Sequence, residues 1–158
     1  MSDASFADAD PGPLTLRAED ADDLRIISAL VQDAVVTVSD IAWDARSRRL
    51  SMLVNRFRWE DAEAARRENR PFERTRALLV LSDVTRLSSD GIDRADRGLV
   101  LSLLALDWQA AEDGAGTITL TFAGDGALAA RVECIAVDLR DVTRPYVAPS
   151  RHEPRHPD

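Results

Sequence analysis

The residue types that most often carry chemistry are scarce in this chain. Its only histidines are His152 and His156, and its only cysteine is Cys134. The histidine spacing could place two imidazoles on one helical face for a metal, but prolines flank the pair and no third ligand is near. Cys134 lies in an apolar segment, so we expect a buried core thiol. Acid–base and nucleophilic catalysis usually need a positioned histidine. The sequence therefore predicts no catalytic residue, no metal site and no cofactor.

Two copies of a short Asp-Arg motif are the next candidates. Asp83 and Arg86 stand in LSDVTR, and Asp141 and Arg144 stand in LRDVTR. Each pair could form a structural ion pair at a strand end, or the arginine could bind an anion, because guanidinium matches carboxylate and phosphate. We favour the structural role. An enzyme that works with the two carboxylates alone stays as an alternative.

The segment NRFRWE offers a candidate binding surface made of Arg56, Phe57, Arg58 and Trp59. Alternation along a strand would put the rings on one face and the guanidinium groups on the other. In the simplest interpretation, the rings face the core and the arginines face the solvent. Exposed rings would instead indicate a protein partner, or single-stranded nucleic acid stacked between rings and arginines.

Charge is unevenly distributed along the 158 residues, whose net charge is −8. Residues 1–43 hold nine acidic residues and two arginines, whereas residues 44–76 hold ten arginines and six acidic residues. The Arg-rich segment 46–76 makes nucleic-acid binding an alternative. The acidic molecule as a whole should repel polyanions, which favours a protein partner.

The elements that would position these residues begin with a helix over 20–32. Asp20 is a plausible N-cap, and Leu24, Ile27 and Leu30 recur at helical spacing. Residues 60–71 are polar on every side and predict an exposed loop or a short surface helix. Residues 1–13 and 148–158 read as disordered tails around a single domain at 14–147.

The remaining segments read as strands. VVTVSDIAW and LSMLVNRFRW predict a hairpin, and the second strand changes its apolar face after Val54, which predicts a bulge or a sharp bend. RTRALLVLSDVTRL should be a central strand. TITLTFA and ALAARVECIAVDL predict a second hairpin. Residues 98–109 show no decisive period.

An internal duplication is suggested by the two DVTR segments. Trp43 precedes Phe57 by 14 residues, and Trp108 precedes Phe122 by 14. On this alignment the ambiguous run 98–109 is a strand. The fold class is then α+β and mainly β, with six or seven antiparallel strands in a curved sheet or small barrel and one N-terminal helix packed on it.

The order of features, with VNRFRWE in the middle and DVTR followed by Pro-Tyr near the end, resembles a family of short alphaproteobacterial proteins known only as a domain of unknown function. The resemblance covers residues 14–147. It implies a pleckstrin-homology-like or similar small barrel and no established activity.

Together these observations predict a cytoplasmic, non-enzymatic binding or adaptor domain that contacts protein partners or itself, with a homodimer as one arrangement. No apolar run approaches the roughly 20 residues that span a bilayer, so no membrane role is expected. The alternatives are a nucleic-acid-binding protein and a carboxylate-based enzyme.

Overall fold

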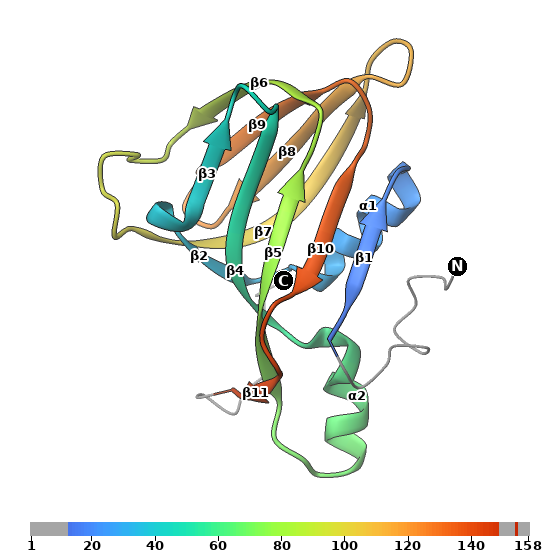
Figure 1. Ribbon diagram of the computed structural model, residues 1–158. Coiled ribbons are helices and arrows are strands. Elements are labelled where there is room, and N and C mark those ends of the chain that lie inside the picture. The colour runs from blue at the N-terminus through green and yellow to red at the C-terminus, as the bar shows by residue number, and fades with distance from the viewer. Residues whose placement is uncertain (1–12, 149–153, 155–158) are drawn as a thin grey trace.

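A computed structural model describes residues 13–148 and residue 154 as one strongly curved antiparallel sheet with two helices (Figure 1). The predicted tails, including His152 and His156, lie almost wholly outside the described residues. None of the helices in the described part of the chain is long and apolar enough to cross a membrane.

The helices are α1 (Ala21–Leu30) and α2 (Trp59–Arg67), and a 3-10 turn spans Val38–Asp40. The strands are β1 (Thr15–Ala18), β2 (Ala34–Thr37), β3 (Ile41–Asp44), β4 (Arg49–Phe57), β5 (Glu73–Leu81), β6 (Val84–Asp90), β7 (Val100–Ala110), β8 (Gly116–Phe122), β9 (Ala127–Val132), β10 (Val137–Asp141) and β11 (Tyr146–Val147). The longest strands are β4, β5 and β7, with nine, nine and eleven residues.

The strands pair in the order β1-β10-β5-β4-β2-β7-β8-β9-β6, while β3 pairs with β4 and β11 pairs with β5. Among the described residues no pairing joins β6 to β1 or to β3, so the sheet is not closed and the expected small barrel is not formed. The mainly β class with an N-terminal helix is confirmed. A pleckstrin-homology-like topology stays a prediction.

The sheet holds eleven strands, more than the six or seven expected, because turns divide three predicted strands into β2 and β3, β5 and β6, and β9 and β10, and because the short strands β1 and β11 were not predicted. The 3-10 turn separates β2 from β3. Asp83, with φ of 57°, bends the chain between β5 and β6. An aspartate tolerates this left-handed conformation because its short side chain bonds locally. Hydrophobic pattern alone does not reveal such a bend.

Helix α1 confirms the predicted N-terminal helix. The Asp20 side chain accepts a hydrogen bond from the Asp23 backbone N–H at 2.8 Å, which caps the first turn. Leu24, Ile27 and Leu30 are buried and join the main hydrophobic core. The helix packs against β1 and β7, so it fills the concave side of the sheet (Figure 1).

The bulge predicted in strand β4 is absent from its pairing with β5, whereas the alternative of a sharp bend stays a prediction. It pairs with β5 in continuous register from Leu50 opposite Leu81 to Phe57 opposite Arg74. The even positions stay buried to the end of the strand because Arg56 continues the inward row. Phe57 is buried as well and packs against Trp59, with ring centroids 4.6 Å apart, where the chain enters α2. The apolar pattern of β4 only appeared to change face, because the inward-facing residue at position 56 is an arginine.

Residues 98–109 are strand, as the internal alignment predicted, because β7 spans nearly all of them. The duplication itself does not fit the fold. Asp83 is exposed in the turn after β5, whereas Asp141 is the buried last residue of β10. The two DVTR segments therefore occupy different positions in the sheet.

Candidate functional site

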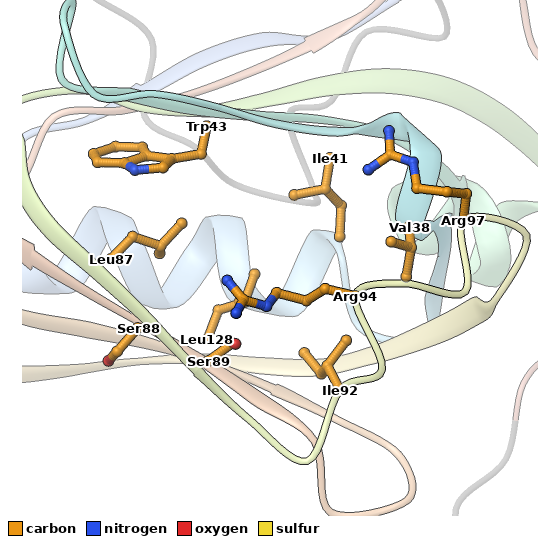
Figure 2. A pocket seen from close by; sticks show the side chains of 10 residues that line it. All are labelled: Val38, Ile41, Trp43, Leu87, Ser88, Ser89, Ile92, Arg94, Arg97 and Leu128. Atoms are coloured by element: carbon orange, nitrogen blue, oxygen red, sulfur yellow. The ribbon is translucent and has the colours of Figure 1, made fainter.

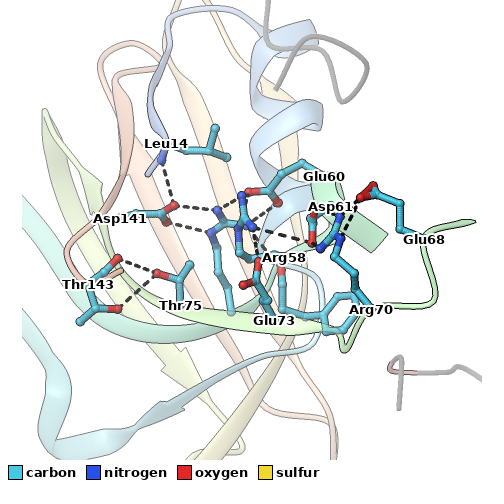
Figure 3. Close-up of polar contacts among 12 residues, drawn as sticks. Leu14, Arg58, Glu60, Asp61, Glu68, Arg70, Glu73, Thr75, Asp141 and Thr143 are labelled. Atoms are coloured by element: carbon cyan, nitrogen blue, oxygen red, sulfur yellow. Dashed lines mark hydrogen bonds and ion pairs between the residues drawn. The ribbon is translucent and has the colours of Figure 1, made fainter. Parts of the chain in front are cut away.

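A buried ion-pair network stands where the sequence suggested a binding surface (Figure 3). Arg56 is fully buried and donates from Nε and Nη2 to the two Asp141 oxygens, at 3.0 and 2.9 Å. It also donates to both Glu60 oxygens, at 2.8 and 2.7 Å. The Leu14 backbone N–H donates to Asp141 Oδ2 at 2.9 Å. The network therefore ties β4, β10, α2 and the entry to β1 together.

Each charged side chain in this network contacts a side chain of opposite charge. Burial alone would lower the pKa of Arg56, but its hydrogen bonds to Glu60 and Asp141 and their negative charges outweigh burial and raise it. Arg56 therefore stays charged. Breaking such a pair would leave an uncompensated charge in the interior.

A second layer of ion pairs surrounds α2. Arg58 is 3% exposed and contacts Glu73 and Asp61, while Arg70 donates to both Asp61 oxygens at 3.1 Å. The Trp59 indole N–H donates to the Gln32 carbonyl at 2.9 Å, which ties α2 to the end of α1. Arg56, Phe57 and Arg58 are thus interior, and they present no surface in this fold.

The predicted Asp-Arg pairs are not formed within the described residues. Asp141 pairs with Arg56 and not with Arg144. Asp83 accepts a hydrogen bond from the Cys134 thiol at 3.5 Å, while Arg86 is exposed and makes no ion pair. The physical reason is the turn at Asp83, which aims its carboxylate at the loop after β9. Cys134 is exposed, so the expected core thiol is wrong.

Another feature of the fold is an opening between β3 and β6. One end is closed by the Val84 backbone N–H, which donates to the Arg48 carbonyl at 2.9 Å. The other end is closed by the Val38 and Ser39 N–H groups, which donate to the Leu99 and Arg97 carbonyls at 2.9 and 3.0 Å. Between these closures the facing edges of β3 and β6 are unpaired in the described structure. One unpaired strand edge, of β3 or of β6, therefore lies on each side of a single gap in the sheet.

A cavity of about 290 Å³ lies in this opening (Figure 2). Its lining residues come from the 3-10 turn and β3, from β6, from β9 and from the loop 91–99: Val38, Ile41, Trp43, Leu87, Ser88, Ser89, Ile92, Arg94, Arg97 and Leu128. Val38 and Leu128 belong to the hydrophobic core, whereas Trp43 is 37% exposed. The cavity thus has an apolar floor and a mouth with an aromatic ring and two guanidinium groups, which are the usual components of a binding site.

A family model described as a protein of unknown function (DUF2948) matches residues 14–156. The chain belongs to this family. No curated protein and no solved structure matches it.

The described part of the DUF2948 chain holds no cluster of three metal-ligating side chains. Its buried carboxylates are already engaged by arginines. The cavity was missed by sequence reasoning because its residues come from four separate segments, and none forms a contiguous motif. The available signals were Trp43 at a strand end and the two arginines in GIDRADRG.

Proposed function

We propose that this chain is a non-enzymatic binding domain that contacts a protein partner, or a second copy of itself, through the edges of β3 and β6. The observation that carries the proposal is the pair of unpaired strand edges beside one apolar cavity. An unpaired edge presents N–H and C=O groups to which an extended segment can add as a strand. The proposed site of action is the cytoplasm.

The residues at the opening support this proposal. Proline blocks pairing at a strand edge, and β3, which reads IAWD, contains none and carries its single charged side chain at its end. Trp43 is exposed beside the cavity, and tryptophan is enriched among the anchors of protein interfaces. A partner segment could therefore combine main-chain pairing with an aromatic contact.

The carboxylate-based enzyme has little support. Asp141 lies opposite Ala77, whereas Asp83 follows Leu81, at the other end of the β5–β10 pair. Four residues of strand separate these ends by about 13 Å. Paired catalytic carboxylates work at less than roughly 10 Å. Asp141 is also held by Arg56 in the interior, so the two carboxylates do not share a site.

Nucleic-acid binding through the segment 46–76 is also weakly supported. Five of its arginines contact acidic or polar groups inside the chain: Arg48, Arg56, Arg58, Arg70 and Arg74. An arginine that neutralises a carboxylate contributes little to phosphate binding. Steeply salt-dependent binding of nucleic acid would reopen this alternative.

The test is quantitative mass spectrometry of proteins that co-purify with the tagged chain at low salt after nuclease treatment. The informative variants are Ala42→Lys and Ser88→Lys, which put a charge on the two facing edges at exposed positions. Ala123→Lys, in the exposed turn between β8 and β9, is the matched control. We expect the edge variants to lose a specific partner that the control retains.

Self-association is measured on the same proteins by light scattering. A dimer of the unmodified chain that the edge variants convert to monomer would identify a second copy as the partner. If both edge variants keep the same partners and the same mass as the control, the proposed interface is wrong.

A further inference from the structure

The cavity between β3 and β6 combines two kinds of chemistry. Its floor is formed by aliphatic side chains, among them Leu87, Ile92 and Leu128, so it favours an apolar group. Ser88 and Ser89 add hydroxyls on the β6 side. The volume of about 290 Å³ is at the lower end of the range for small-molecule pockets. A short alkyl chain or one ring fits a space of this size.

Arg94 and Arg97 supply the second kind of chemistry. Both are exposed at the mouth, and neither forms an ion pair or side-chain hydrogen bond with any described residue. Figure 2 shows Arg94 extending across the cavity toward Leu87, while Arg97 points toward Ile41. In a chain with net charge −8, the arginines of the interior network are all paired with carboxylates. Two unpaired guanidinium groups at one apolar cavity are suited to an anion.

The loop that carries these arginines is held in place. The Arg97 and Leu99 carbonyls accept hydrogen bonds from Ser39 and Val38, and the Asp93 side chain accepts one from the Ala95 backbone N–H at 3.1 Å. Gly126, next to the loop, leaves room for Ile92, since a Cβ there would lie 3.0 Å from its Cγ1. The backbone from which the two arginine side chains extend therefore has a defined position relative to the apolar floor.

We infer that this cavity binds a short apolar molecule with one anionic head group. The apolar part lies against Leu87, Ile92 and Leu128 under the Trp43 ring, and the head group accepts hydrogen bonds from Arg94 and Arg97. Carboxylate and phosphate both match the guanidinium fork. This inference does not depend on the proposed partner, because the ligand contacts side chains that line the cavity and leaves the main-chain edges free, with Trp43 the one residue that belongs to both surfaces.

Calorimetric titration of the purified protein tests the inference with four probes of equal chain length: octanoate, octyl phosphate, octanol and octylammonium. We expect saturable binding of octanoate or octyl phosphate, with the tighter one identifying the head group. We expect the alcohol to bind at least about tenfold more weakly than the anions. A charged head group forms a stronger hydrogen bond with guanidinium than a hydroxyl does, and this difference changes the affinity by about tenfold or more. The cation should not bind.

The matched variants separate binding from folding. Replacing both mouth arginines, Arg94→Gln with Arg97→Gln, should weaken binding of the anion at least about tenfold. The control Arg86→Gln with Arg131→Gln removes two exposed arginines of the β6–β9 pair and should leave binding unchanged. Unfolding temperatures of all variants are recorded to show that the fold is retained.

Three results would overturn the inference: no saturable binding of either anion at millimolar concentration, equal affinity for the alcohol and the anions, or equal affinity in the mouth and control variants. None of these measurements involves a protein partner. Failure here therefore leaves the strand-edge proposal standing, and loss of that proposal leaves this inference standing.

Discussion

The Arg56 guanidinium holds the Asp141 carboxylate by two parallel hydrogen bonds, although the two residues are 85 positions apart in the chain. Both side chains are fully buried. Charge-assisted, bidentate pairs of this kind are the strongest hydrogen bonds that side chains make. The contact fixes the end of β10 against β4, close to the point where α2 begins.

Replacement of Arg56 should be strongly destabilising. Arg56→Met keeps the length of the side chain but leaves Asp141 buried without a countercharge and leaves Glu60 with only its ion pair to Arg58. We expect a loss of about 3–5 kcal/mol in the free energy of unfolding, measured by urea denaturation.

The control for this variant is Arg86→Met, at an exposed arginine without an ion pair among the described residues. We expect a change within about 0.5 kcal/mol. Equal effects of the two substitutions would contradict the role given to the network.

Gly116 should not tolerate a side chain. A Cβ at this position would collide with the Trp108 ring and the Gln109 carbonyl. We expect Gly116→Ala to lower the free energy of unfolding by about 1–3 kcal/mol. At Gly98 the nearest atom to such a Cβ is 3.9 Å away, so Gly98→Ala should be close to neutral. Thermal unfolding of both variants measures the difference, and a neutral Gly116→Ala would show that β7 and β8 are packed less closely here.

Cys134 should react slowly for an exposed thiol. Partial desolvation and the hydrogen bond to the Asp83 carboxylate raise the pKa of the Cys134 thiol, so less thiolate is present at neutral pH. Asp83→Asn removes the negative charge, and asparagine also tolerates the left-handed backbone at this position. We expect a several-fold faster reaction with a disulfide reagent at pH 7 and a reactivity profile shifted to lower pH. An unchanged profile would mean that Asp83 does not act on the thiol.

Sequence reasoning succeeded where the signal was local. The cap at Asp20 and the apolar spacing after it placed α1, and clean alternation placed β8. The prediction for β4 failed at Arg56. A charged residue among the inward-facing positions of a strand looks, in the sequence, like a change of the apolar face. Only the fold brings Asp141 and Glu60 to that guanidinium, and no local pattern predicts such a pairing.

The candidate site was harder to predict for the same reason. Trp43, Leu87, Arg94 and Leu128 meet only because the unpaired edges of β3 and β6 face each other across one opening. Pairing order is a property of the whole chain. Alternation within each strand carries no information about it.

Backbone hydrogen exchange tests the central claim most directly. In the free protein we expect the outward amides of β3 and β6 to exchange far faster than those of β4 and β5, because edge amides lack ladder hydrogen bonds. With a recovered partner bound, the same β3 and β6 amides should become protected. Slow exchange of both edges in the free protein, or protection that appears only elsewhere, would contradict the proposal that this opening is the binding site.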